Sequence, residues 1–319
     1  MSSDASLSKW GKTKEILRIA YTLPFVLSSI VGVSYALTIT SEWLIAVLIP
    51  LDVFFLALFV NFSNDYFDHK SGVDRIRFGE QDAETKAELS KLFNEKVFWS
   101  GNSFDRGLIT ERQGKVVMAL IAAVAILIAI PIILYGGWIV VALGLVGLAL
   151  AFFYTAPPVN LGARGLGETN VFLSFTFMAF FSYYVIAQVF DWVMLLLAVS
   201  IGLAAMMMRL SDEAPGYPAH VRVGEKNLLV RFGLDKLTKI LTGLVVAFYI
   251  AVAGAILLEP WFAILLMTVP IPLVALKLYR MDDRLKYWRS IPQFLKLAVG
   301  TEMLIVVALI ARTAWTSWL

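Results

Sequence analysis

Residues 43–68 read WLIAVLIPLDVFFLALFVNFSNDYFD, and this stretch decides the fold class because an apolar run passes without a break into a polar cluster. Up to Asn64 the run contains one charged side chain, Asp52. A helix needs about 20 apolar residues to cross the roughly 30 Å hydrocarbon core of a bilayer. The run also lacks the alternation of apolar and polar residues that is typical of membrane β-strands. The stretch therefore predicts a membrane-spanning helix that ends in polar residues.

Eight further apolar blocks of similar length lie along the 319-residue chain, of which 59% is hydrophobic and 16% charged. Soluble domains carry about 25% charged residues. We therefore expect an all-α, polytopic membrane bundle of nine transmembrane helices, forming a single domain over residues 1–319. The nine expected spans are residues 18–37, 43–64, 115–135, 137–155, 169–189, 192–209, 239–258, 260–278 and 294–315.

The basic residues predict the orientation of these spans. Lys and Arg gather before the first span and after the second, fourth, sixth and eighth spans, whereas the other short loops carry none. Under the positive-inside rule the amino terminus and the long loops after spans 2 and 6 are cytoplasmic, and the carboxyl terminus lies outside. A plasma membrane location is expected because no targeting segment is recognisable. The net charge of +3 indicates no nucleic-acid partner, and the absence of cysteine excludes disulfides and thiolate metal sites.

The polar cluster at the end of the second span has metal-ligand spacing. Asn64, Asp65 and Asp68 are three and four residues apart, so their side chains share one face of a helix. Oxygen ligands at a membrane boundary suit Mg²⁺, which typically takes one or two carboxylates together with substrate phosphates. The alternative interpretation is a solvated helix end, where acidic residues cost little.

The same run resembles the first Asp-rich motif of the UbiA superfamily of intramembrane prenyltransferases, N-D-x-x-D-x-x-x-D. Asn64, Asp65 and Asp68 match this motif, whereas its last acid falls on Gly72. Asp74, two residues later, resembles the variant in the branch that prenylates 1,4-dihydroxy-2-naphthoate for menaquinone. The segments FYTAPP at 153–158 and GARGLGE at 162–168 also resemble that branch, as does Arg18 followed by Thr22-Leu23-Pro24.

The resemblance implies Mg²⁺-dependent transfer of an isoprenoid chain from a prenyl diphosphate to an aromatic, naphthoate-like acceptor within the bilayer. Asp65 and Asp68 are then expected to act in catalysis through the metal, and Tyr154 to face the allylic cation. The residues expected to contact the diphosphate are Lys70, Arg75, Arg164, Lys226 and Arg231.

The second Asp pair of the superfamily, D-x-x-x-D after span 6, is missing. The following GEKNLLVRFG at 224–233 fixes the register, and in that register the two acids fall on Gly216 and His220. Two explanations are consistent with this loss. Asp212 and Glu213 supply the ligands from one turn earlier, or the second ion is bound weakly or not at all. We expect Asp212 rather than His220 to be the ligand, because imidazole matches Mg²⁺ poorly.

Two other functions remain open at this stage. Another branch of the superfamily would use a 4-hydroxybenzoate, haem, chlorophyll or glycerol-phosphate lipid acceptor, but its usual R-P-x-x-R-P-like element is not found at 101–110. A secondary transporter would place charged residues near the middle of spans, where Asp52 is the main example. The sequence leaves the donor chain length, the acceptor, the number of metals and the oligomeric state open.

Overall fold

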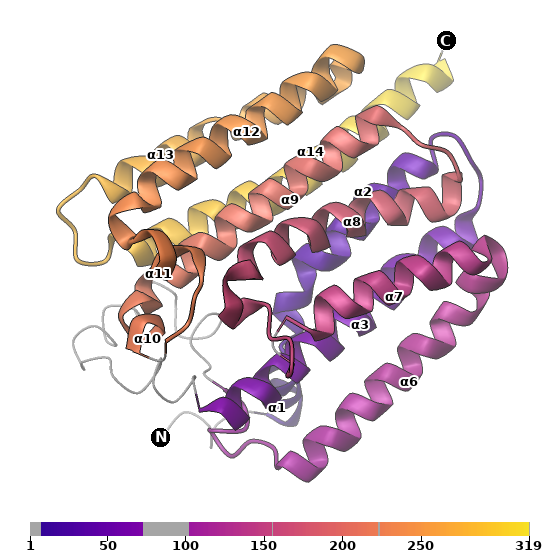
Figure 1. The fold of residues 1–319 in the computed structure, drawn as a ribbon. Helices are drawn as coiled ribbons and strands as arrows, with labels where there is room; N and C mark the ends of the chain where they lie inside the picture. Colours follow the sequence, from indigo (N-terminus) through magenta and orange to yellow (C-terminus); the bar gives the residue numbers. More distant parts are fainter. Residues whose placement is uncertain (1–7, 73–101, 155, 223, 319) are drawn as a thin grey trace.

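The computed structural model describes residues 8–72, 102–154, 156–222 and 224–318, and the elements in them are helices (Figure 1). The apolar helices are α2 (Leu23–Ala36), α3 (Trp43–Ser71), α6 (Glu111–Gly136), α7 (Trp138–Phe152), α8 (Gly167–Ala187), α9 (Trp192–Glu213), α12 (Leu237–Leu258), α13 (Pro270–Tyr279) and α14 (Lys286–Trp318). Shorter helices are α1 (Lys9–Ile16), α10 (Tyr217–Arg222) and α11 (Leu228–Phe232). The prediction of an all-α membrane bundle is confirmed.

Eight helical stretches in the described ranges have the length and composition that crossing a bilayer requires. They include 3₁₀ segments that continue a helix, such as Pro260–Thr268 before α13. The remaining apolar helix, α7, lies where the fourth span is expected and has 15 residues, fewer than the roughly 20 of a full span. Eight of the nine expected spans therefore correspond to a helix of spanning length.

Helix α9 lies at the centre of the bundle, because it packs against α8, α12 and α14. Its side chains Met194, Leu197, Ile201 and Leu210 are completely buried. Helix α2 packs between α3, α8 and α14, and α6 lies along α3 on the outside. The amino-terminal part, α10 and α11 lie at one end of the bundle, and the carboxyl terminus lies at the other (Figure 1).

We expect Gly32→Ala to destabilise this packing, because α2 and α8 approach closely at Gly32. A Cβ there would lie 2.2 Å from the carbonyl oxygen of Ala179 and 2.8 Å from the Cβ of Ser182. Overpacking of this kind costs about 1–3 kcal/mol. Gly243→Ala in α12 is the matched control, since its added Cβ has no described atom within 4 Å apart from its chain neighbours and the nearby backbone of its own helix. Thermal unfolding in detergent should show a lower midpoint for Gly32→Ala alone, and equal midpoints would contradict the prediction.

Candidate active site

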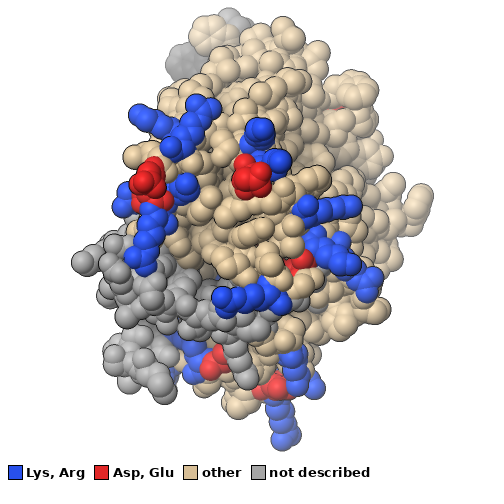
Figure 2. Space-filling view, turned by 60° about the vertical axis from the view of Figure 1, so that its left-hand side comes forward, with Lys and Arg blue, Asp and Glu red and all other residues tan. Residues whose placement is uncertain are grey.

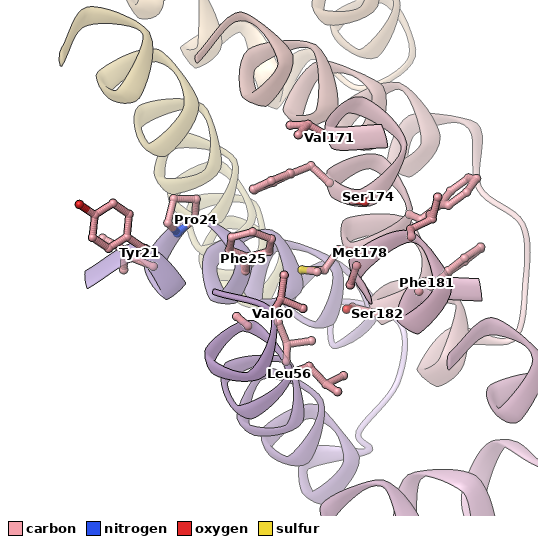
Figure 3. Close-up of a pocket in the computed structure, with 18 of the residues that line it drawn as sticks. Tyr21, Pro24, Phe25, Leu56, Val60, Val171, Ser174, Met178, Phe181 and Ser182 are labelled. Atoms are coloured by element: carbon pink, nitrogen blue, oxygen red, sulfur yellow. The ribbon is translucent and has the colours of Figure 1, made fainter. Parts of the chain in front are cut away.

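A cavity of about 970 Å³ runs between α2, α3, α7, α8 and α14 and reaches the last turns of α9. Most of its wall is apolar. Leu56 and Val60 of α3 lie in the same wall region as Met178 of α8, and Phe25 of α2 lies beside them (Figure 3). Pockets for small ligands usually measure about 300–1,000 Å³, so this cavity is at the large end of that range.

One end of the cavity is polar, and we define this polar end by Asn64, Tyr154, Arg209 and Asp212, all of which line the wall. Asn64 belongs to the first motif, near the end of α3, and Asp212 lies near the end of α9, four residues before Gly216, the first expected position of the second motif. The structure therefore brings the two motif regions into the wall of one cavity. The predicted metal ligands Asn64 and Asp212 both face it.

Arg209 is held in place by two carboxylates on its own helix. Its guanidinium lies 3.5 Å from Asp212 and forms a second ion pair with Glu213, three and four residues further along α9. The guanidinium carbon also lies 5.6 Å from the centre of the Tyr154 ring. Cation–π contacts of this kind act within about 6 Å. Arg209 is therefore a fixed positive charge in the cavity wall.

Tyr154 presents a hydroxyl group that the described residues do not satisfy. The hydroxyl oxygen is buried and has no hydrogen-bond partner among them. Burial raises the pKa of Tyr154 well above its ordinary value, and the nearby acids Glu213, Glu168 and Asp68 raise it further, although Arg209 opposes them. The phenol is therefore neutral and is available as a hydrogen-bond donor to a ligand at the polar end.

Asp65 is paired with Arg18 from the amino-terminal segment. Its carboxylate accepts a hydrogen bond from the Arg18 guanidinium, and it is 1% exposed. The side chain of Asn102 donates to the backbone carbonyl of Asp65 at 2.7 Å. Arg18 itself has a left-handed backbone, with φ of 51°, and lies 4.3 Å from the ring of Tyr21, which lines the cavity. Asp65 thus joins the end of α3 to the segment around Arg18 and to the segment around Asn102.

Asp68 lies one helical turn beyond Asn64 on the same face of α3. It is partly buried, and its charge contributes to the raised pKa of Tyr154. Asp68 therefore lies close to the polar end, where the first motif is expected to act.

Four of the five cations expected to contact the diphosphate are described, and none of these four lines the cavity. Lys70 pairs with Glu111 at 2.7 Å, and Arg164 donates to the carbonyl of Pro158 at 2.9 Å. Lys226 and Arg231 are exposed near α11. The fifth cation, Arg75, lies outside the described residues, as does Asp74.

The RGLGE segment holds the loop before α8 against the segment before α11. Gly165 has φ of 85°, and a Cβ there would lie 2.3 Å from the carbonyl oxygen of Lys226. Only glycine adopts this backbone at low cost, and only glycine fits the close approach. The buried side chain of Glu168 accepts a hydrogen bond from the backbone N–H of Leu228 at 2.8 Å. This segment acts on the site by fixing the surrounding loops.

The two positions that lack the acids of the second motif lie away from the cavity wall. Gly216 ends a 3₁₀ turn after α9, and His220 lies in α10. His220 is buried, and its Nδ1 lies 2.5 Å from the Glu225 carboxylate. Asp212 and His220 are the two residues considered above as ligands of the second metal. Asp212 lines the cavity and His220 does not.

The donor atoms at the polar end suit a metal that is shared with a substrate. No cluster of three or more His, Cys, Asp or Glu side chains able to hold a metal occurs in the described part of the chain. Mg²⁺ rarely uses such a complete protein cage, and it binds through one or two carboxylates together with phosphates and waters. Asn64, Asp68 and Asp212 provide an amide and two carboxylates of this type. The residues present therefore fit Mg²⁺ in the presence of a diphosphate.

Sequence reasoning did not assign a role to two cations that line the cavity, Arg209 and Lys296. For Arg209 a signal existed, since Asp212 and Glu213 follow it at three and four residues on one helix face. Lys296 falls near the start of the ninth expected span, where no motif marks it. It lies six residues beyond Ser290, whose hydroxyl bonds to that of Ser211 at 2.9 Å, so Lys296 lines a deeper part of the wall.

The end of the bundle that holds the site carries many charged side chains. Figure 2 shows Lys and Arg side chains spread over this face, with fewer Asp and Glu side chains among them. A basic surface attracts anionic substrates and anionic lipid headgroups.

Comparisons with known proteins agree on the family. Residues 102–299 match the model of the UbiA prenyltransferase family. The 2-carboxy-1,4-naphthoquinone phytyltransferase of Synechocystis sp. is 27% identical over 74% of this chain and 71% of its own length. The 1,4-dihydroxy-2-naphthoate octaprenyltransferase of Bacillus subtilis is 21% identical over 84% of this chain and 80% of its own length.

The fold is shared with solved structures. A UbiA homologue from Archaeoglobus fulgidus, solved with DMAPP and Mg²⁺, superposes with a TM-score of 0.63 at 18% identity, covering 93% of this chain and 99% of that one. A digeranylgeranylglyceryl phosphate synthase superposes with a TM-score of 0.63 at 15% identity, covering 96% of this chain and 100% of that one. At these identities the likeness concerns the fold alone.

Proposed function

The chain belongs to the UbiA prenyltransferase family, and we propose that it transfers a prenyl group from a prenyl diphosphate to an aromatic acceptor related to 1,4-dihydroxy-2-naphthoate, in menaquinone biosynthesis. The relatives that act on naphthoate and naphthoquinone substrates support this acceptor class. The observation that carries the proposal is a cavity that Asn64 and Asp212 both line at its polar end and whose remaining wall is mostly apolar. A prenyl diphosphate has two matching parts, since its diphosphate is charged and its isoprenoid chain is apolar.

In this proposal the side chains at the polar end either hold Mg²⁺ or contact the diphosphate directly. The candidate holders of Mg²⁺ are Asn64 and Asp212, which line the cavity, together with Asp65 and Asp68, which lie beside Asn64 on α3 without lining it. Asp65 also pairs with Arg18. When bound, Mg²⁺ supplies positive charge that stabilises the diphosphate as the allylic C–O bond breaks. Arg209 provides a fixed charge toward the leaving oxygens, and the neutral hydroxyl of Tyr154 donates a hydrogen bond to them.

The apolar wall protects the allylic cation from water until an electron-rich ring carbon of the acceptor attacks it. The new C–C bond replaces the broken C–O bond, the diphosphate leaves, and the ring carbon loses a proton. The Arg209 guanidinium lies over the face of the Tyr154 ring, and this contact fixes the orientation of the ring. Lys296, deeper in the wall, supplies positive charge for the carboxylate of the acceptor.

The setting of the reaction is also part of the proposal. The chain is an integral membrane protein. We propose a plasma membrane location with the polar end of the cavity on the cytoplasmic side, as the distribution of basic residues predicts. A soluble diphosphate then enters from the cytoplasm, and the lipophilic product leaves into the bilayer.

We expect the purified protein in lipid to form product from labelled geranylgeranyl diphosphate and 1,4-dihydroxy-2-naphthoate with Mg²⁺, and to form none with EDTA. The same assay offers 4-hydroxybenzoate and a glycerol-phosphate lipid as competing acceptors. Product with one of these alone would keep the reaction and change the acceptor. Absence of product with every acceptor, in protein that still binds the diphosphate, would contradict the proposed activity.

A further inference from the structure

Asp52 is an acidic residue inside the membrane-spanning part of α3, and the function described above does not use it. It lines the cavity between Ile49 and Leu56, among apolar side chains. Its Oδ1 atom is buried without a hydrogen-bond partner among the described residues, and none of the ion pairs in those ranges involves it. Acidic residues at membrane depth are costly, so an unpaired one in a cavity wall indicates a function.

The depth of Asp52 excludes a direct role in the chemistry at the polar end. Asp52 precedes Asn64 by twelve residues of continuous helix, which corresponds to about 18 Å at about 1.5 Å per residue. Between the two levels α3 contributes apolar side chains, Leu56 and Val60, and α8 contributes Met178 together with Ser174 (Figure 3).

Building on the proposed function, we propose that Asp52 is a specificity-determining residue that limits the length of the prenyl chain the cavity accepts. A water molecule in the deep part of the cavity hydrates the carboxyl group when the bound chain is short. A longer chain displaces this water and leaves the carboxyl oxygens against hydrocarbon. An unsatisfied buried polar group is unfavourable. Chains that pass Asp52 therefore bind less tightly than expected from the apolar surface that they bury.

The geometry gives an approximate limit. With carbon–carbon bonds of about 1.5 Å, an isoprene unit of four chain bonds extends about 5 Å when fully stretched. At about 1.5 Å of helix rise per residue, a chain of three units that starts at Asn64 therefore ends before Asp52, and a chain of four units reaches it. A chain of eight units must pass Asp52 or leave the cavity sideways.

The test measures binding, so that it does not depend on turnover. Non-reactive thiolodiphosphate analogues of farnesyl and octaprenyl diphosphate are titrated with Mg²⁺ into protein in lipid nanodiscs. The variants are Asp52→Leu, which removes the polar group, and Asp52→Asn, which keeps one. Glu302→Gln is the matched control, because Glu302 is also a buried acid within a span but does not line the cavity.

We expect the ratio of the octaprenyl to the farnesyl Kd to fall about 10-fold in Asp52→Leu, the effect of relieving one unsatisfied polar group. The ratio should stay near the wild-type value in Asp52→Asn and Glu302→Gln, and all variants should keep their affinity for the farnesyl analogue. An unchanged ratio in Asp52→Leu, with farnesyl binding intact, would overturn this inference alone and would mean that long chains leave the cavity before Asp52. Failure of the wild-type protein to bind either analogue would overturn the proposed function and this inference together.

Discussion

Asp68→Ala is expected to lower kcat for prenyl transfer at least about 100-fold, with unchanged expression and thermal stability. Asp68 lies one turn beyond Asn64 on the face of α3 that leads into the cavity, and its charge acts on Tyr154 at the polar end. Loss of this carboxylate removes one of the few hard ligands available to Mg²⁺ there. Single-turnover transfer of labelled prenyl diphosphate measures the effect on the chemical step.

A second variant separates metal binding from folding. Asp68→Asn keeps the shape of the side chain and removes its charge, so it should raise the Mg²⁺ concentration required for half-maximal activity as well as lower kcat. The control is Asp235→Ala, because Asp235 is an exposed acid whose ion pair is with its neighbour Lys236. Full activity in Asp68→Ala would show that the metal is held elsewhere.

A helix of this fold was predictable wherever its apolar length and its polar end are determined by the residues of the helix itself. The apolar run of α3 and the acids that follow it at helical spacing predicted both the span and its polar end, and α3 extends to Ser71. The spans predicted at 43–64 and 192–209 end earlier than α3 and α9, because polar residues end a span without ending a helix. The length of α7 is the main difference, since this helix ends at Phe152, three residues before the expected end of the span at 155.

The site was predictable only in part, because several of its contacts join distant segments. Spacing within α3 indicated the first motif, and the resemblance to the UbiA superfamily assigned it. The pairing of Arg18 with Asp65 and the stacking of Arg209 on Tyr154 depend on how helices pack, and no local pattern encodes them. For the same reason the sequence favoured basic residues close to the motifs, such as Lys70, whereas the cavity wall carries Arg209.

Arg209→Lys is expected to lower kcat/KM for the prenyl diphosphate about 100-fold, although the positive charge is retained. The planar guanidinium contacts Asp212 and Glu213 while lying over the ring of Tyr154. A lysine ammonium makes point contacts and does not reproduce this geometry. Since Glu213 is buried, complete loss of the cation would leave an uncompensated charge and destabilise the protein, which is why lysine is the informative replacement.

The measurement combines transfer kinetics with thermal unfolding of the same samples, and Arg280→Lys, at an exposed position after α13, is the control. A functional role for Arg209 predicts a large fall in kcat/KM, a midpoint of unfolding within a few degrees of the wild type, and weaker binding of inorganic diphosphate. A large fall in the midpoint with normal kcat/KM per folded molecule would instead assign Arg209 to the stability of α9. The two outcomes differ because a diphosphate contact acts only when substrate is bound, whereas the pairs with Asp212 and Glu213 act at all times.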